Sequence, residues 1–424
     1  MGIDSGIDGG NAQKHERFEM SGLQGTIMLP GSKSESNRAL MIAAYGGFSP
    51  EVVNRSEAHD TILLETLLKE AQNKTHGRID AEDAGTVSRF LMTYLASTPG
   101  EWQLTGNERL RQRPMAPLIK ALQQLGAEIA CEGEEGCLPV LIHGKRLEGG
   151  RVQLDASKSS QFVTSLLLAA PTWKEGLQLS LTGEIVSSPY ISMTLAMMEQ
   201  FGARVVCEGD MITVAHQWYG PNRFVVSADW SAASYWYEML ALSAGGRLLL
   251  KGLRRDVLQG DARVADLFKP LGIRTEYVDD GALITFDGLS RPVEKQLEFD
   301  LSDTPDLFPA ILVTCVVLHI ECVFVGISTL FHKESDRVNS LITELSKVYT
   351  FINIIEDDKL VIGKSSLSDS LFIDRNLSFN TYRDHRVAMA LAGLKLVFGE
   401  VAIKDSEAVN KSYPKFWKEF GKLI

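Results

Sequence analysis

Residues 29–40 combine small, hydroxyl and cationic side chains, a mixture suited to binding an anion. Ser32 is a good N-cap for the helix that the following residues predict. Lys33 and Ser34 fall in its first turn, and Arg38 shares a face with Ser34 because it lies four residues later. Free N–H groups at a helix start attract anions, so this segment predicts an anion site. The alternative is a solvated basic helix start.

Further segments of this kind recur along the chain, each ahead of an apolar helical stretch. They are residues 83–89, 157–162, 187–190, 303–306, 332–337 and 381–386, with Lys411 near the end. Each alone is compatible with an ordinary helix cap, and 332–337 also with an exposed helix start on which Lys333 and Arg337 share a face. Together they predict a ligand with two or more anionic groups, bound between repeated units.

Three arginines, Arg109, Arg111 and Arg113, alternate along the chain ahead of Pro114. If this segment is extended, the alternation places all three guanidinium groups on one face. The alternative is a solvated loop. The rigid proline favours Arg113 as the arginine that is held in place.

Composition indicates a globular enzyme of two or three domains. The chain has 424 residues, of which 45% are hydrophobic and 23% charged. The net charge of −11 argues against nucleic acid as a partner. It is compatible with a small anionic substrate, because a basic pocket can be local.

Cysteine usage and hydropathy indicate the compartment. The five cysteines and eight histidines show no metal-ligand spacing, and an odd number of cysteines fits a reducing cytoplasm. The longest apolar run, residues 310–318, is too short to span a bilayer. Residues 1–16 resemble neither a signal nor a transit peptide, so we expect a mobile leader or a non-native addition. We expect a cytoplasmic protein without membrane contact.

A helix–glycine–strand turn recurs along the chain. It occurs at Gly126, Gly202 and Gly272, and a fourth copy has Tyr349 in place of the glycine. The spacing of roughly 75 residues would hold two helices and several strands, which predicts repeated α/β modules instead of one doubly wound sheet. The alternative is that such turns occur in any α/β protein.

The ordered set of motifs resembles that of the 5-enolpyruvylshikimate-3-phosphate synthases, a family of enolpyruvyl transferases. The shared motifs are L-P-G-S-K-S at 29–34, A-G-T at 84–86, R-P at 113–114, S-S-Q-F at 159–162, Q-G-D at 259–261, K-E-S-D-R at 333–337, D-H-R at 384–386 and Lys411. The resemblance implies an α/β fold of two similar lobes, each of three βαβαββ units (an inside-out α/β barrel), with the active site between them.

The resemblance also implies how the chain is divided. A discontinuous lobe, residues 1–30 plus 228–424, would carry Asp306, Glu334, Arg386 and Lys411. An inserted lobe, residues 31–227, would carry Lys33, Arg38, Arg113 and Ser160.

The family reaction moves an enolpyruvyl group from phosphoenolpyruvate to the 5-hydroxyl of shikimate 3-phosphate and releases phosphate, with neither metal nor cofactor. By resemblance, Asp306 accepts the hydroxyl proton, Glu334 protonates the methylene carbon with help from Lys411, and Lys33 contacts both substrates. Shikimate 3-phosphate would contact Lys33, Ser34, Arg38, Ser159, Ser160, Gln161, Ser187, Tyr190, Asp306 and Lys333. Phosphoenolpyruvate would contact Lys33, Gly85, Arg113, Gln161, Arg337, His385, Arg386 and Lys411. We expect a monomer that binds these two small anions.

Three positions depart from the family pattern. Asp83 and Thr329 stand where the family usually or often has asparagine, and Phe331 stands where it usually has arginine. We expect the charge of Asp83 to disfavour phosphoenolpyruvate unless a cation neutralises it, and Arg89 is one possible partner.

Two other functions remain open at this stage. A sister family acts on UDP-N-acetylglucosamine, but most of its members carry a reactive cysteine where this chain has Glu108. A non-catalytic anion-binding protein could share the scaffold. The joint presence of Asp306, Glu334 and Lys411 favours an enzyme.

Overall fold

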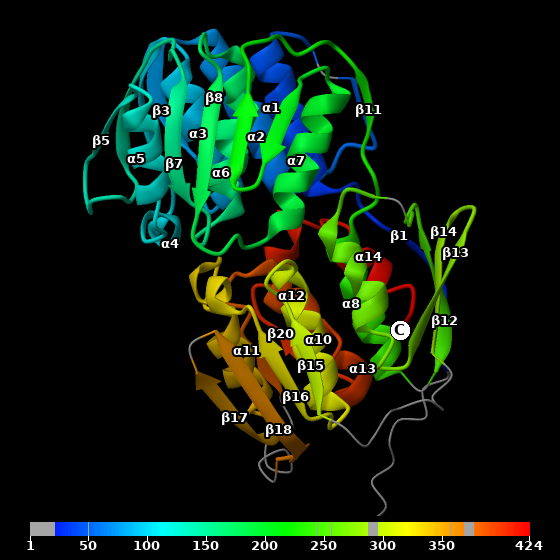
Figure 1. The fold of residues 1–424 in the computed structure, drawn as a ribbon. Helices are drawn as coiled ribbons and strands as arrows, with labels where there is room; N and C mark the ends of the chain where they lie inside the picture. The colour runs from blue at the N-terminus through cyan, green and yellow to red at the C-terminus, as the bar shows by residue number, and fades with distance from the viewer. Residues whose placement is uncertain are drawn as a thin grey trace, which may run out of the picture.

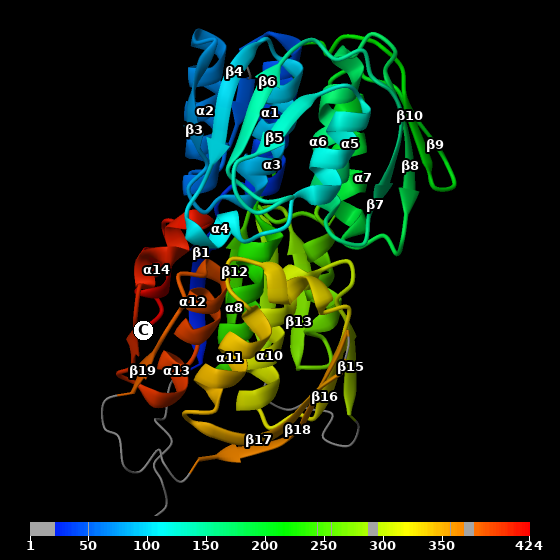
Figure 2. The ribbon, with the colours of Figure 1, turned by 90° about the vertical axis from the view of Figure 1, so that its left-hand side faces the viewer.

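The computed structural model describes residues 22–49, 51–243, 245–255, 257–286, 296–356, 358–368 and 377–424. The expected leader, residues 1–16, lies outside these ranges. Figures 1 and 2 show two lobes stacked on each other, with most of the long helices running toward the boundary between them. The upper lobe is coloured from blue to green, and the lower lobe from green to red with the blue strand β1 (Leu23–Met28) added.

Four four-stranded sheets share one topology, in which the first two strands are parallel and the last two form an antiparallel hairpin. In the upper lobe they are β3 (His76–Asp80), β4 (Gly100–Thr105), β6 (Val140–Gly144) with β5 (Glu128–Cys131), and β7 (Gly150–Asp155), β8 (Leu177–Thr182), β10 (Met211–Val214) with β9 (Val205–Glu208). In the lower lobe they are β1, β12 (Gly246–Lys251), β14 (Gly281–Phe286) with β13 (Ile273–Val278), and β15 (Leu297–Asp300), β16 (Cys322–Val325), β18 (Lys359–Leu367) with β17 (Tyr349–Glu356). Each lobe adds one short parallel pair: β2 (Glu51–Val53) with β11 (Arg223–Val225), and β19 (Ser378–Phe379) with β20 (Ala402–Ile403).

Helices connect and cover these strands. In the upper lobe they are α1 (Lys33–Gly46), α2 (His59–Asn73), α3 (Gly85–Ser97), α4 (Glu108–Arg111), α5 (Ala116–Gln124), α6 (Ser160–Ala169), η1 (Ala170–Thr172) and α7 (Ser188–Gln200). In the lower lobe they are α8 (Trp230–Leu242), η2 (Gly260–Arg263), α9 (Val264–Leu267), η3 (Pro305–Leu307), α10 (Phe308–Val317), η4 (Ser328–His332), α11 (Arg337–Leu345), α12 (His385–Ala392), α13 (Lys395–Phe398), η6 (Ser406–Lys411) and α14 (Phe416–Phe420). None of the helices in the described ranges has the length and apolar character needed to cross a membrane.

The predicted repeat is confirmed by the common sheet order. Gly126, Gly202 and Gly272 each follow a helix and have φ angles of 92°, 89° and 93°, a left-handed conformation that favours glycine. The fourth turn differs from the prediction, because Tyr349 opens strand β17 and does not occupy a left-handed turn position. The helix α11 therefore passes into its strand without the glycine turn.

The mixed α/β fold class is confirmed, and the described strands form open sheets instead of a closed barrel. The outer hairpin strand of each four-stranded sheet pairs with one neighbour only, so the sheets do not join edge to edge. The sheets of each lobe surround buried helices. The most buried apolar side chains come from α3, α6, α8 and α10.

Two hydrophobic clusters form the core. One draws its members from residues 39–226, and the other from Leu23, Ile27 and residues 228–420. The two connections between them run side by side: Ser32 N–H donates to the Ser227 carbonyl at 2.8 Å, and Asp229 N–H donates to the Pro30 carbonyl at 2.9 Å. This pairing supports the predicted division at residues 30 and 227, which stays a prediction.

Among the described residues of the lower core, the carboxylic acid of Glu238 has no hydrogen-bond partner. Glu238, in α8, is fully buried, and both of its carboxyl oxygens lack a partner among the described residues. Burial raises the pKa of Glu238 well above its ordinary value of 4.5. The folded protein therefore keeps a proton that the unfolded chain releases above pH 4.5, so the free energy of unfolding falls as the pH rises.

We expect Glu238→Gln to remove this pH dependence. Between pH 5 and pH 8 the wild type should lose stability by up to ~1.4 kcal/mol per pH unit relative to the variant, because one proton is involved. Chemical denaturation across this range measures the difference, with the exposed Glu175→Gln as the control. Parallel pH profiles for wild type and Glu238→Gln would show that Glu238 does not titrate on unfolding.

Candidate active site

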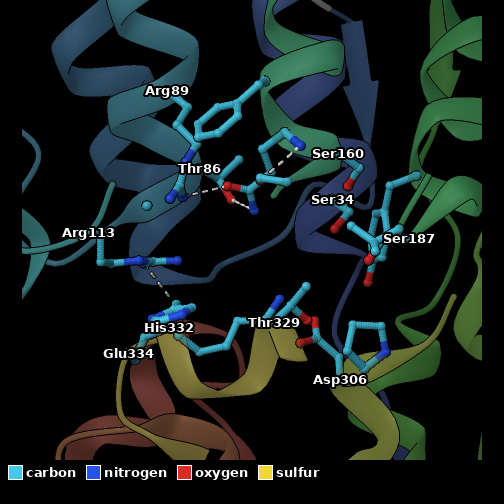
Figure 3. Close-up of a pocket in the computed structure, with 18 of the residues that line it drawn as sticks. Ser34, Thr86, Arg89, Arg113, Ser160, Ser187, Asp306, Thr329, His332 and Glu334 are labelled. Carbon is cyan, nitrogen blue, oxygen red and sulfur yellow. Dashed lines mark hydrogen bonds and ion pairs between the residues drawn. The ribbon is translucent and has the colours of Figure 1, made fainter. Parts of the chain in front are cut away.

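A cavity of about 400 Å³ lies between the lobes and contains almost all of the predicted site residues in its wall (Figure 3). The upper lobe contributes Lys33, Ser34, Arg38, Gly85, Arg113, Ser159, Ser160, Gln161, Ser187 and Tyr190. The lower lobe contributes Asp306, Lys333, Glu334, Arg337, His385 and Arg386. Lys411 is absent from this wall, although it contacts the wall residue Asp60.

Helix starts converge on the cavity, as the recurring segments predict. The first residues of α1, α3, α6, α11 and α12 all line it. Ser32 caps α1 by accepting from Glu35 N–H at 3.4 Å, and Ser159 caps α6 by accepting from Gln161 N–H at 3.2 Å. The remaining N–H groups and the helix dipoles of both lobes therefore make the cavity favourable for anions.

The upper wall holds two arginines close together at the start of α3. Gly85 leaves room for both guanidinium groups, because a Cβ at this position would lie 2.4 Å from Arg113 Nη1 and 2.6 Å from Arg89 Nη1 and would displace them. Arg89 Nη1 donates to Gln161 Oε1 at 2.7 Å, and Gln161 Nε2 donates to Thr86 Oγ1 at 3.0 Å. The buried Nε of Arg89 and the Nε and Nη1 of Arg113 have no hydrogen-bond partner among the described residues. Buried guanidinium groups of this kind favour a phosphate or carboxylate ligand.

Arg38 forms part of the same wall but is largely satisfied by the protein. It is 2% exposed and donates to Thr194 Oγ1 at 2.8 Å, the Ser34 carbonyl at 2.9 Å, the Tyr190 carbonyl at 3.1 Å and Thr164 Oγ1 at 3.3 Å. Burial lowers its pKa to about 10, so it remains a cation at neutral pH. Its four donated bonds fix the guanidinium group and the adjacent Tyr190 in place.

The lower wall is organised around Arg337, which is 1% exposed and contacts three carboxylates. Its Nη1 lies 2.9 Å from Asp306 Oδ1, its Nη2 lies 2.7 Å from Glu334 Oε2, and its Nε lies 2.8 Å from Asp384 Oδ2. Asp384 is fully buried and also caps α12 by accepting from Arg386 N–H at 2.9 Å. Asp384 is therefore the fixed anchor of Arg337, while Asp306 and Glu334 border the cavity.

Both candidate catalytic carboxylates are held in the ionised form. Burial raises the pKa of Asp306, but Arg386, Lys333 and Arg337 together lower it well below its ordinary value. Burial likewise raises the pKa of Glu334, and Arg337 and Arg113 lower it by more. Arg386 Nη2 lies 2.5 Å from Asp306 Oδ2, and Arg113 Nη1 lies 3.9 Å from Glu334 Oε1.

Two lysines from different lobes share one buried carboxylate. Asp60, at the start of α2, lies 2.9 Å from Lys33 Nζ and 3.1 Å from Lys411 Nζ. Burial raises the pKa of Asp60, and the two lysines lower it below its ordinary value. No sequence pattern indicates the role of Asp60, because an acidic residue in a first helical turn is usually only a dipole partner.

His385 borders the cavity but is 1% exposed, and neither ring nitrogen has a hydrogen-bond partner among the described residues. Burial, with the charges of Lys33 and Arg386 added, lowers the pKa of His385 well below its ordinary value. The imidazole is therefore neutral at physiological pH, so an uncharged ring would contact a ligand in the cavity.

The interpretation of residues 332–337 as one helical start is wrong. Lys333 and Arg337 do not share a helical face, because η4 ends at His332 and α11 begins at Arg337, capped by Asp336. Both side chains reach the cavity because the segment between the two helices follows its wall.

Arg109, Arg111 and Arg113 do not form an extended row, because α4 occupies residues 108–111 and separates them. Arg111 Nε donates to the Gly106 carbonyl within its own lobe, whereas Arg109 Nη2 crosses to the Lys333 carbonyl at 3.1 Å. Arg113, as predicted, lies in the cavity wall.

The three departures from the family pattern have different surroundings. Thr329 lines the cavity with its buried Oγ1 unpartnered among the described residues, and Phe331 packs against the lower core. Asp83 pairs with Lys411, at 2.6 Å between Oδ1 and Nζ, and not with Arg89. Asp83 also borders a second cavity of about 280 Å³, which shares Arg113 and Glu334 with the first.

The fold and the site define a two-lobed α/β protein with a cavity between its lobes that is lined by helix starts and cationic side chains. Comparison with known proteins places it among enzymes. The sequence profile of the EPSP synthase (3-phosphoshikimate 1-carboxyvinyltransferase) family matches residues 47–420. The chain is 41% identical over 406 residues to a 3-phosphoshikimate 1-carboxyvinyltransferase of Bacteroides fragilis, covering 95% of this chain and 96% of that protein. It is 34% identical over 425 residues to the enzyme of the same name from Syntrophobacter fumaroxidans, covering 95% and 98%.

The fold agrees with solved structures. An EPSP synthase from Acinetobacter baumannii superimposes with a TM-score of 0.70 at 23% identity, over 95% of this chain and 96% of that one. The chain belongs to the EPSP synthase family.

Proposed function

We propose that the protein transfers the enolpyruvyl group of phosphoenolpyruvate to the 5-hydroxyl of shikimate 3-phosphate, releasing phosphate, as a step of chorismate and aromatic amino acid biosynthesis. Family membership supports the reaction. The observation that supports this reaction at the cavity is the pair of carboxylates Asp306 and Glu334, which both contact Arg337 in the cavity wall. Such a pair can serve as base and acid in one addition.

In the proposed addition, the 5-hydroxyl oxygen of shikimate 3-phosphate attacks C2 of phosphoenolpyruvate, and Asp306 accepts the hydroxyl proton. Glu334 gives a proton to the methylene carbon, which becomes a methyl group. The product of this step is a tetrahedral phosphate ketal, whose charge Arg113, Arg337 and Arg386 stabilise. In the second half, the methyl group returns a proton to Glu334, the C2–O bond to phosphate breaks, and the enol ether is formed. The leaving phosphate takes up the proton that Asp306 accepted, so both carboxyl groups return to their starting states.

The ion pairs of the site provide a way to set the two protonation states. The acidic groups of phosphoenolpyruvate compete with Asp306 and Glu334 for Arg337 and Arg386. As Arg337 turns to the substrate, it stabilises the Glu334 carboxylate less, so the pKa of Glu334 rises, whereas Lys333 continues to lower the pKa of Asp306. Glu334 can then hold the proton that it donates, while Asp306 remains close to the attacking hydroxyl.

The remaining site residues are proposed to hold the substrates. Shikimate 3-phosphate would meet the hydroxyl and cationic groups of the upper wall with Lys333, and phosphoenolpyruvate would meet the arginines beside Gly85. The residues that surround the cavity include no cysteine, and Glu108 borders only the second cavity, which disfavours the sister transferase that acts on UDP-N-acetylglucosamine. We also propose a cytoplasmic monomer, since the five cysteines are free and one chain supplies both walls of the cavity.

A coupled phosphate-release assay tests the proposed reaction. Phosphate should appear when shikimate 3-phosphate and phosphoenolpyruvate are present together, and neither substrate alone should release it. Release from phosphoenolpyruvate alone would indicate a phosphatase. No release from the pair would favour the non-catalytic anion-binding alternative.

A further inference from the structure

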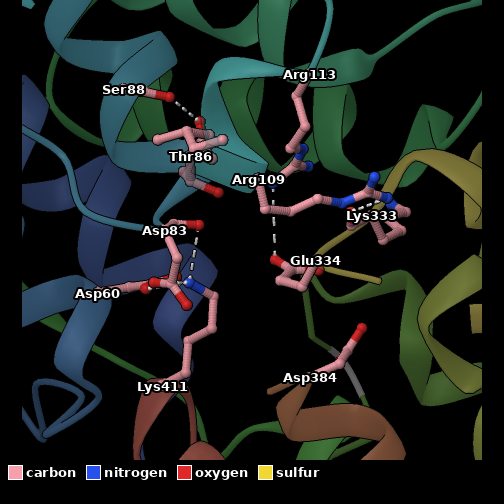
Figure 4. A network of polar contacts seen from close by, with 12 residues as sticks. Asp60, Asp83, Thr86, Ser88, Arg109, Arg113, Lys333, Glu334, Asp384 and Lys411 are labelled. Carbon is pink, nitrogen blue, oxygen red and sulfur yellow. Dashed lines mark hydrogen bonds and ion pairs between the residues drawn. The ribbon is translucent and has the colours of Figure 1, made fainter. Parts of the chain in front are cut away.

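Lys411 is linked to the opposite lobe by two hydrogen bonds to Asp83 and an ion pair with Asp60. It ends η6 in the lower lobe, and its Nζ lies 2.6 Å from Asp83 Oδ1, 3.1 Å from the Asp83 carbonyl oxygen and 3.1 Å from Asp60 Oδ1 (Figure 4). Two of the three N–H donors of the ammonium group are hydrogen-bonded to Asp83, and the contact with Asp60 is an ion pair. A phosphoenolpyruvate group that binds Lys411 therefore competes with the negative charge of Asp83 for the ammonium group.

The charges of this cluster are balanced. Lys33 and Lys411 face Asp60 and Asp83, giving two cations and two carboxylates. Burial lowers the pKa of Lys411, but Asp60, Glu334 and Asp83 raise it above its ordinary value, so the ammonium stays charged. With asparagine at position 83 the cluster would keep one net positive charge, which would attract an anion.

Asp83 is the contact that a ligand can displace most easily. Its side chain is 37% exposed, whereas that of Asp60 is 2% exposed and bound by both lysines. A carboxylate near water can release Lys411 and become hydrated, while a buried one cannot do so without a large desolvation cost.

We propose that Asp83 is a positioning residue that holds Lys411 across the lobe boundary and competes with phosphoenolpyruvate for it. The proposal rests on the proposed function. An asparagine, the usual residue of the family at this position, can offer Lys411 a neutral amide oxygen in the same place. Asp83 therefore gives this enzyme a weaker affinity for phosphoenolpyruvate than its asparagine variant has, in exchange for a firmly placed lysine.

The test compares Asp83→Asn, Asp83→Ala and the control Asp80→Asn. Asp80 ends strand β3, three residues before Asp83, and its side chain is 49% exposed. It pairs at 3.6 Å with Arg78 and borders neither cavity. Calorimetric titration with phosphoenolpyruvate alone gives its affinity without turnover, and steady-state kinetics give KM and kcat.

We expect Asp83→Asn to tighten phosphoenolpyruvate binding and lower its KM by about three- to tenfold, the effect of one partly screened charge. The KM for shikimate 3-phosphate should change much less. Asp83→Ala should instead lower kcat by roughly tenfold, because Lys411 loses its closest contact and is held less firmly by the remaining backbone carbonyl and Asp60.

Weaker phosphoenolpyruvate binding in Asp83→Asn would overturn the proposal, because Asp83 would then orient Lys411 toward the ligand instead of competing with it. An equal gain in Asp80→Asn would also overturn it, since any nearby charge would suffice. Failure of the proposed function gives a different result, a wild type that releases no phosphate from the substrate pair. The calorimetric comparison still decides the role of Asp83 in that case.

Discussion

Asp306→Asn and Glu334→Gln should each lower turnover by roughly two to four decades, with much smaller changes in substrate affinity. Each substitution keeps the shape of the side chain and removes its ability to accept or donate the transferred proton. Both carboxylates contact Arg337, at 2.9 Å and 2.7 Å, so an amide oxygen can keep that contact. Steady-state phosphate release measures kcat, and calorimetry with single substrates measures affinity.

The matched control for these variants is Asp300→Asn, which makes the same chemical change in the lower lobe at a residue outside the cavity. Its turnover should match that of the wild type. Near wild-type turnover in either Asp306→Asn or Glu334→Gln would reject the proton-transfer role of that residue.

Arg337→Met should reduce the free energy of unfolding by roughly 3–5 kcal/mol at neutral pH, because it leaves buried carboxylates without their cation. Asp384 is fully buried, and Arg337 donates to it through Nε. In the wild type the lowered pKa values of Asp306 and Glu334 give stability that is present above the ordinary carboxyl pKa and is lost as the pH falls. The difference between variant and wild type should therefore shrink toward pH 3.

Denaturant unfolding at several pH values measures this difference. Arg337→Lys, which keeps the charge but not the planar fork of donors, should fall between the two and provides a folded variant if Arg337→Met does not fold. The exposed Arg111→Met is the control for loss of a positive charge. A loss of stability that does not depend on pH would mean that Arg337 acts mainly through packing.

The anion-binding cavity was predictable from the sequence. Helix starts with serine, glycine, lysine and arginine can be recognised from a few neighbouring residues. Ser32 and Ser159 cap their helices as expected, and the predicted anion-binding residues of both lobes, except Lys411, line one cavity. The repeat was visible for a similar reason, since a glycine such as Gly126 marks a left-handed helix end. These signals depend on neighbouring residues only.

Pairings between distant segments were not predictable. Lys411 and Asp83 are 328 residues apart, and nothing in either segment indicates the other. The ion pairs of Asp60 and Asp384 were not predictable for a related reason. In sequence, a buried acid at a helix start cannot be distinguished from a helix cap. The helix boundary before Arg337 was missed because its capping residue, Asp336, lies inside a charged run that has helical spacing throughout.

The most direct test of enolpyruvyl transfer in this cleft is solvent deuterium incorporation. The proposed addition makes a methyl group whose hydrogens are equivalent by rotation, so elimination in heavy water should leave deuterium in the methylene group of the product enol ether. Proton NMR of the product formed from shikimate 3-phosphate and phosphoenolpyruvate should show that methylene signal reduced by deuterium. A product formed with no deuterium at this carbon would contradict protonation by Glu334 and the tetrahedral intermediate together.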